Sequence, residues 1–129
     1  MAQKIALLFP GQGSQSVGML SELLESSDIV KATFNEASSA LGYDLAALVL
    51  NGPEEELNQT HRTQPALLTA SVAIYRHWLA ANPDVDVVMA GHSLGEYSAL
   101  VCSDVISLGE AVKLVENRGL YMQEVVPAG

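Results

Sequence analysis

The chain has 129 residues, of which 49% are hydrophobic and 16% are charged, a balance typical of one ordered globular domain with a buried core. Its 15 acidic residues outnumber 6 lysines and arginines and give a formal net charge of −9. That charge argues against nucleic acid as a partner, because a phosphate backbone is bound by clustered cations.

The first predicted element is a strand over residues 4–9, KIALLF, closed by the loop PGQGSQ. A short continuous apolar run that ends in proline and glycine is typical of a buried strand. The same run is too short for a signal peptide or a membrane span. Because the single cysteine, Cys102, also excludes an internal disulfide, we expect a reduced, cytoplasmic protein that contacts no membrane.

Helices are predicted between this strand and the next. One covers about residues 29–41, with Asp28 as its cap and Gly42 at its end. Two short helices begin at Asp44 and in the segment GPEEEL, whose acidic residues suit the positive end of a helix dipole. The segment TQPALLTASVAIYRHWLA, which Thr63 opens as a cap, predicts a largely buried crossover helix.

A second strand is predicted over residues 85–91, VDVVMAG. Its β-branched, uninterrupted sequence suits a parallel sheet that is covered on both faces. The last helix begins with a capping box of Ser107 and Glu110. Its predicted apolar face consists of Ala111, Leu114, Val115, Met122 and Val125. The order of strands and helices places the chain in the α/β class.

The sequence MAGHSLGEYSALV places Ser93 in the pattern G-x-S-x-G, between the second strand and a helix. This context is typical of a nucleophile elbow, a sharp turn that exposes a serine at the end of a buried strand. Gly91 and Gly95 remove side chains that would clash there, and the N–H of Leu94 then points toward an oxyanion at Ser93. The alternative is a turn with a structural role alone.

The loop PGQGSQ is predicted to lie near Ser93, because parallel strands bring their carboxyl ends to the same edge of a sheet. The backbone N–H of Gln12 is then the natural second donor of an oxyanion hole. A plain glycine-rich turn and a phosphate-binding loop are the alternatives, although no Gly-Lys-Ser/Thr sequence follows.

Arg118 is a permanent cation on the apolar face predicted for the last helix. A guanidinium in this position favours a carboxylate partner and can hold one with two hydrogen bonds. The partner is either a ligand or one of the 15 acidic residues; in a third interpretation the aliphatic stem is buried and the charged end reaches water. If the partner is a ligand, that ligand carries a carboxylate.

A serine nucleophile needs a base, yet no histidine follows Ser93 in the chain. His92 adjoins Ser93 on a strained turn, where neighbouring side chains diverge, so we expect it to line the site rather than to act as the base. His61 and His77 are predicted to lie on the surface, and Cys102 to be a small buried hydrophobe. These residues lack zinc-ligand spacing, so no metal site is predicted.

Several segments together carry a resemblance to a known family: LFPGQGSQ, GPEEELNQT, TQPALLTASVAIYR, GHSLGEYSALV and VENRGLYMQE. Across its whole length the chain resembles the bacterial malonyl-CoA:acyl-carrier-protein transacylases of fatty acid synthesis. The resemblance implies a parallel α/β sheet with an α/β-hydrolase-like nucleophile elbow, the N-terminal portion of the large subdomain of the acyltransferase fold. It also implies malonyl-CoA, a coenzyme A thioester, as substrate, acyl carrier protein as partner, no bound cofactor and a monomer.

The resemblance implies a role for individual residues as well. Ser93 is the catalytic nucleophile that takes the malonyl group, and Gln12 and Leu94 are the backbone donors to the oxyanion. The residues that it assigns to substrate binding are Arg118, which holds the free malonyl carboxylate, His92 and Gln64.

Members of this family are more than twice as long as this chain. Residues 1–129 are therefore expected to be the N-terminal part of the hydrolase-like large subdomain. The ferredoxin-like small subdomain and the C-terminal return, which bears the catalytic histidine, are absent from this chain.

Two other functions stay open. A serine esterase or thioesterase on a similar fold would share the elbow but have no use for Arg118. Otherwise the chain is a catalytically inert fragment or a docking module for a carrier protein. Docking alone is disfavoured because acyl carrier proteins are acidic and this chain has a net charge of −9.

Overall fold

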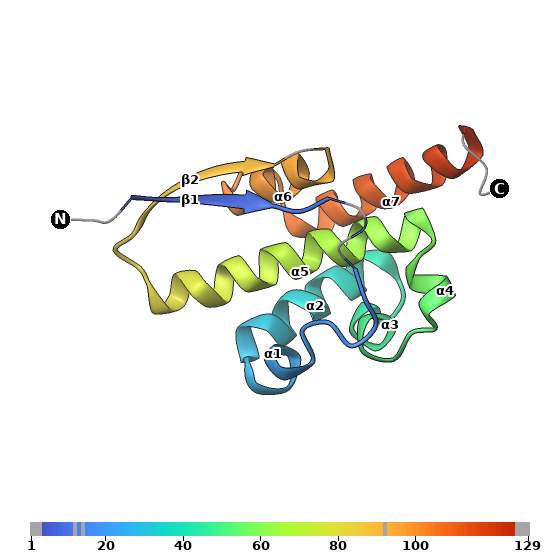
Figure 1. Ribbon diagram of the computed structural model, residues 1–129, viewed down its shortest axis with the longest axis horizontal. Coiled ribbons are helices and arrows are strands. Elements are labelled where there is room, and N and C mark those ends of the chain that lie inside the picture. The colour runs from blue at the N-terminus through green and yellow to red at the C-terminus, as the bar shows by residue number, and fades with distance from the viewer. Residues whose placement is uncertain (1–3, 12, 14, 92, 126–129) are drawn as a thin grey trace.

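The computed structural model of the protein describes residues 4–11, 13, 15–91 and 93–125. The elements in chain order are β1 (Lys4–Phe9), α1 (Ser21–Ser26), α2 (Asp28–Leu41), α3 (Leu45–Asn51), α4 (Glu54–Leu57), α5 (Thr60–Ala81), β2 (Asp86–Gly91), α6 (Leu94–Cys102) and α7 (Leu108–Val125) (Figure 1). The α/β class predicted from the sequence is confirmed. No helix in the described part of the chain is both long and apolar enough to cross a membrane.

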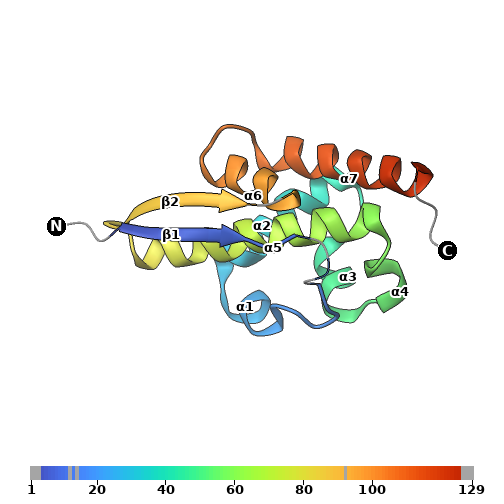
Figure 2. The same ribbon diagram turned by 45° about the horizontal axis from the view of Figure 1, so that its top comes forward.

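Strands β1 and β2 form a parallel sheet, with Lys4 opposite Asp86 and Phe9 opposite Gly91. Both strands therefore end at the same edge, as Figure 1 and Figure 2 show. The chain leaves β1 through Pro10 and leaves β2 toward the serine turn at this edge, which is the arrangement that the sequence predicted.

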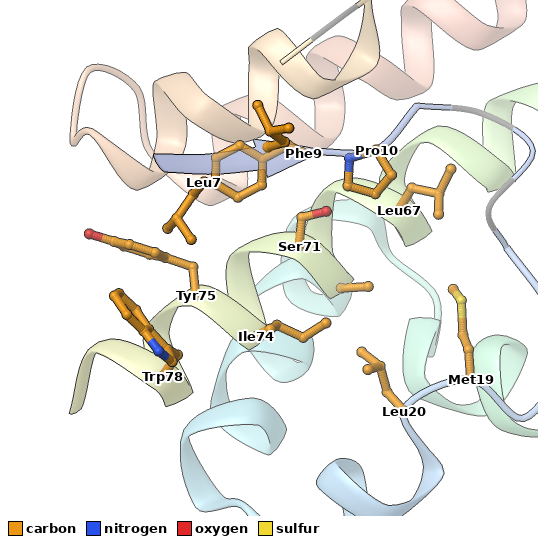
Figure 3. Close-up of a pocket in the computed structure, with 12 residues that line it drawn as sticks. Leu7, Phe9, Pro10, Met19, Leu20, Leu67, Ser71, Ile74, Tyr75 and Trp78 are labelled. Carbon is orange, nitrogen blue, oxygen red and sulfur yellow. The ribbon is translucent and has the colours of Figure 1, made fainter. Parts of the chain in front are cut away.

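Within the described part of the chain one face of the sheet is left open, so the prediction that both faces are covered is wrong there. Side chains along the strands alternate between exposed and half-buried, and Leu8 and Val88 on the outer face are 80% and 48% exposed. The inner face is turned toward α5, and Leu7 and Phe9 point to that helix (Figure 3). Because the strands are apolar at both sets of positions, their sequence does not distinguish a covered face from an open one.

Helix α5 is the central element. It lies between the sheet and α2 in Figure 1, and it contacts α2, α4, α6 and α7. Residues 63–73 of this helix are buried without a break, which confirms the predicted buried helix. Phe34 of α2, Leu68 of α5 and Val115 of α7 are fully buried and join these helices in one core.

Two predicted helix starts are wrong. Helix α5 begins at Thr60, and the hydroxyl of Thr63 instead donates to two preceding backbone carbonyls. Helix α2 is capped by Ser27, whose Oγ accepts a hydrogen bond from the N–H of Val30, and Asp28 is its first helical residue. Each segment contains several polar residues that can cap a helix, and the apolar pattern does not choose between them.

Helix α7 starts as predicted, since Oγ of Ser107 accepts a hydrogen bond from a backbone N–H of the first turn. Its predicted apolar face is wrong in part: Leu114 and Met122 are 49% and 39% exposed, and the side chain of Val125 lies outside the described ones. The buried residues of α7 are Leu108, Ala111, Val112, Val115 and Gly119. This face packs against α2 and α5.

Candidate active site

Ser93 lies in the sharp turn between β2 and the start of α6 at Leu94. Its backbone angles, φ 57° and ψ −115°, belong to a region that residues other than glycine rarely adopt. A Cβ atom at Gly91 would overlap the backbone of Gly95, and one at Gly95 would overlap the carbonyl of Phe9. The turn thus requires both glycines, as predicted, and its geometry is typical of a nucleophile elbow.

The turn presents Ser93 at the N-terminus of α6. Ser93 is exposed, whereas the side chain of Leu94 is 1% exposed and anchors the turn in the core. As the first residue of α6, Leu94 has an N–H without an acceptor inside the helix. An oxyanion at Ser93 would meet this N–H and the positive end of the helix dipole. Gln12, the predicted second donor, lies outside the described residues.

Three predicted site residues from three elements meet at this turn. Nη2 of Arg118, on α7, donates a hydrogen bond to Oγ of Ser93 at 2.9 Å. Nη1 of Arg118 donates to Oε1 of Gln64, on α5, at 2.8 Å. One guanidinium therefore connects the serine turn to the central helix.

Close packing of α7 on α5 places Arg118 in this position. The next residue, Gly119, lies so close to α5 that a Cβ atom there would overlap the backbone of His61. A second contact between the helices joins Nδ1 of His61 and Oε1 of Gln123 at 2.7 Å. The side chain of Arg118 therefore leaves α7 at the border of its buried face and reaches Ser93 half-buried.

No acidic side chain neutralises Arg118. All 15 acidic residues lie in the part of the chain that the structure describes, and none has an oxygen within 4.0 Å of the Arg118 guanidinium. The ring of Tyr97 is its other neighbour, with its centroid 5.7 Å from Cζ of Arg118. The internal ion pair considered as one alternative is therefore wrong, and the positive charge is available to an anionic ligand.

Two residues of this site were missed by sequence reasoning. Tyr97 lies four residues after Ser93 on α6, and Met122 lies four residues after Arg118 on α7, where its Sδ accepts a hydrogen bond from Gln64. Spacing of four residues puts a side chain on the same side of a helix. Inspection of the residue four positions after each predicted site residue would therefore have identified both Tyr97 and Met122.

The histidines of the described chain do not supply a base at Ser93. His77 is exposed, as predicted, and its Nδ1 lies 2.8 Å from Oγ of Ser27. His61 is half-buried rather than on the surface and contacts Gln123. His92 lies outside the described residues. Among the described residues, Oγ of Ser93 accepts a hydrogen bond from Arg118 and from no histidine.

Cys102 is buried, and burial raises the pKa of its thiol to about 12. The thiol is therefore protonated at neutral pH and is no nucleophile, which confirms that it is a small buried hydrophobe. Among the residues that the structure describes, no three histidine, cysteine or acidic side chains are grouped as metal ligands would be.

A hollow of about 450 Å³ lies between β1 and α5 (Figure 3). Its lining is mainly apolar and consists of Leu7, Leu8, Phe9, Pro10, Met19, Leu20, Leu67, Ala70, Ser71, Ile74, Tyr75 and Trp78. Ser93, Gln64 and Arg118 lie outside it. The hollow therefore has no part in the candidate active site.

The chain is similar to known transacylases in sequence and in structure. It is 62% identical over 126 residues to the malonyl CoA-acyl carrier protein transacylase of Escherichia coli (strain K12), covering 98% of this chain and 41% of that protein. The structure of the corresponding transacylase (FabD) from Coxiella burnetii matches with a TM-score of 0.94 and 62% identity, over 100% of this chain and 41% of that one.

A further solved structure contains a carrier protein. It is described as a type II PKS acyl-carrier protein in complex with its malonyl-transacylase, and it matches with a TM-score of 0.92 and 58% identity over 99% of this chain. This chain spans 41% of the length of each of these relatives. The family model of the acyl transferase domain matches residues 6–129. The chain therefore belongs to the acyl transferase domain family.

Proposed function

We propose that the protein containing this chain transfers the malonyl group of malonyl-CoA to the phosphopantetheine thiol of acyl carrier protein, in fatty acid biosynthesis. The proposal is carried by the 2.9 Å hydrogen bond between Arg118 and Ser93, made by a guanidinium without an acidic partner among the described residues. A nucleophile beside an unpaired cation suits an acyl group that ends in a carboxylate. A neutral ester would make no use of this cation, which disfavours an esterase or thioesterase.

In the first step, Oγ of Ser93 attacks the carbonyl carbon of the thioester, and a base takes the serine proton. The backbone N–H groups of Leu94 and Gln12 are proposed to bind the resulting oxyanion. Removal of one such donor costs on the order of a hundredfold in rate. When the intermediate collapses, the C–S bond breaks and coenzyme A leaves as a thiol with the proton from the base, so that a malonyl ester remains on Ser93.

In the second step, the phosphopantetheine thiol attacks this ester and Ser93 recovers its proton as the C–O bond breaks. Arg118 holds the malonyl carboxylate in both steps. For this it exchanges its hydrogen bond to Ser93 for one or two bonds to the carboxylate, while its bond to Gln64 can stay in place. His92, next to the nucleophile, is proposed to line the same site.

The base is proposed to be a histidine outside this chain. In this view, residues 1–129 are the N-terminal part of a hydrolase-like large subdomain, and a ferredoxin-like subdomain and a return segment with the histidine complete the protein. Two findings support it: the described histidines bond to Ser27 and Gln123 rather than to Ser93, and the chain spans 41% of its relatives' length.

Acyl carrier protein is the proposed acceptor, and the similarity to a transacylase solved with a carrier protein supports it. The protein is further proposed to act in the cytoplasm as a monomer without a resident cofactor, since neither step needs a metal or a redox group.

The test is the intact mass of the full-length protein before and after brief exposure to malonyl-CoA, with Ser93→Ala as the control. We expect a malonyl-sized mass increase in the wild type that is absent in the variant and that is lost again when the phosphopantetheine form of acyl carrier protein is added. An unmodified wild type, or an equal increase in the variant, would contradict the proposal.

A further inference from the structure

Both the oxygen and the nitrogen of the Gln64 side-chain amide form hydrogen bonds. It is fully buried on α5, with 0% of its surface exposed. Its Oε1 accepts a hydrogen bond from Nη1 of Arg118 at 2.8 Å, and its Nε2 donates to Sδ of Met122 at 3.2 Å. Arg118 and Met122 lie one turn apart on the same side of α7. One amide from α5 therefore bridges two residues of α7.

These two neighbours determine the orientation of the Gln64 amide. A guanidinium only donates hydrogen bonds, and a thioether only accepts them. If the amide turned over, its NH₂ group would face the donor nitrogen of Arg118 and its oxygen would face the Met122 sulfur. Met122 thus keeps the amide oxygen directed toward Arg118, and Gln64 in turn fixes one side of the guanidinium while the other side faces Ser93.

Because the Gln64 side chain is uncharged, it leaves the positive charge of Arg118 in place. A glutamate at this position would have nearly the same shape, but its carboxylate would form a buried ion pair with Arg118. An acyl carboxylate arriving at Arg118 would then meet a pair with no net charge and a second negative group. The amide instead satisfies one guanidinium N–H and leaves the positive charge for the ligand, in a site where no described acidic side chain competes for it.

From these contacts we infer that Gln64 is a positioning residue that determines acyl specificity. It orients Arg118 toward the acyl group on Ser93. Because it is uncharged, it also preserves the preference for acyl groups that end in a carboxylate. The inference rests on the proposed transfer of a malonyl group. It assigns Gln64 an action through Arg118 rather than direct contact with the substrate.

The experiment compares kcat/KM for malonyl-CoA and for acetyl-CoA, which lacks the carboxylate, in the full-length wild type, in Gln64→Glu and in Gln64→Met. Methionine approximates the size of glutamine but has no amide oxygen to accept from Arg118, and it adds no charge. Thermal unfolding of each variant shows whether it folds.

We expect the malonyl/acetyl ratio of kcat/KM to fall in the order wild type, Gln64→Met, Gln64→Glu. In Gln64→Glu it should fall by about tenfold to a hundredfold, the range that one hydrogen bond to a charged group can account for. The loss should come from malonyl-CoA, with kcat/KM for acetyl-CoA changed far less. In Gln64→Met the KM for malonyl-CoA should rise while the KM for acetyl-CoA stays near that of the wild type.

A role in packing alone would lower kcat/KM for both substrates equally, so an unchanged ratio in both variants would overturn the inference. If the malonyl/acetyl ratio of kcat/KM were as low in Gln64→Met as in Gln64→Glu, the part of the inference that depends on Gln64 being uncharged would be overturned. If Gln64→Glu does not fold, Gln64→Met decides by itself, since a wild-type ratio there overturns the positioning role. A wild type that takes no malonyl group on Ser93 would instead refute the proposed function, and the inference with it.

Discussion

Arg118 differs from the other arginines of the chain in its partners. Arg62 lies 3.9 Å from Glu56 and Arg76 lies 3.5 Å from Glu36, both in partly exposed ion pairs of a kind that contributes about 0–1 kcal/mol. Arg118 is half-buried and donates to a neutral hydroxyl and a neutral amide. A carboxylate ligand therefore gains more at Arg118 than at Arg62 or Arg76, because no described acidic side chain neutralises the charge of Arg118.

Replacement of this one residue should change substrate choice rather than abolish acyl transfer. In the full-length protein, Arg118→Ala is expected to reduce the malonyl/acetyl ratio of kcat/KM by about tenfold or more, because malonyl-CoA loses a charge-assisted hydrogen bond that acetyl-CoA never makes. Steady-state kinetics with the two thioesters measure the ratio. Arg76→Ala, which removes a cation from a surface ion pair, is the matched control and should keep the wild-type ratio. An equal ratio in both variants would refute the carboxylate-binding role.

At the scale of elements, the site depends on how closely α7 approaches α5. Gly119 is buried, and its backbone lies so close to that of His61 on α5 that no Cβ atom would fit between them. This contact sets the distance from the α7 backbone to Gln64 and so fixes where the Arg118 guanidinium lies. The helix pair, rather than Arg118 alone, determines the geometry at Ser93.

Gly119→Ala tests this dependence. The added methyl group has no room unless α7 moves away from α5, and overpacking of this kind costs about 1–3 kcal/mol of folding stability. We expect a lower midpoint of chemical denaturation and a higher KM for malonyl-CoA. The control is Gly109→Ala near the start of the same helix, where a Cβ atom would lie 3.6 Å from Cβ of Ala40, an ordinary contact. If both variants had the same denaturation midpoint and the same KM for malonyl-CoA, the close approach of α7 to α5 would affect neither stability nor substrate binding.

The sequence predicted those elements whose residues are constrained by local geometry. The turn at Ser93 follows from two glycines whose absence of Cβ atoms is required, and the parallel strands follow from two apolar runs closed by loops. Prediction from the sequence failed where tertiary packing determines which residues are buried. The buried face of α7 passes through Gly119 instead of through Leu114 and Met122, because close backbone approach to α5 outweighs the burial of two larger apolar side chains.

At the scale of the whole molecule, the candidate site and the apolar hollow lie in different regions. The site joins α5, α6 and α7, whereas the hollow lies under β1 and extends along α5 toward Trp78 (Figure 3). The sheet above the hollow has two strands, and its outer face leaves Leu8 exposed. A two-stranded sheet has little stability of its own, so the sheet here depends on its contacts with α6.

A polypeptide of residues 1–129 alone is therefore expected to bind a hydrophobic dye such as anilinonaphthalene sulfonate, since apolar side chains line an open hollow of about 450 Å³. Dye fluorescence measures this binding, and a cooperative thermal transition distinguishes a folded polypeptide from a loosely packed one. Ile74, which lines the hollow and is 44% exposed, allows a local test: Ile74→Glu should reduce the fluorescence severalfold. Val105→Glu is the matched control, because Val105 is 64% exposed and lies outside the hollow. If both variants reduce fluorescence equally, the dye reports general apolar exposure, and the hollow is closed in solution.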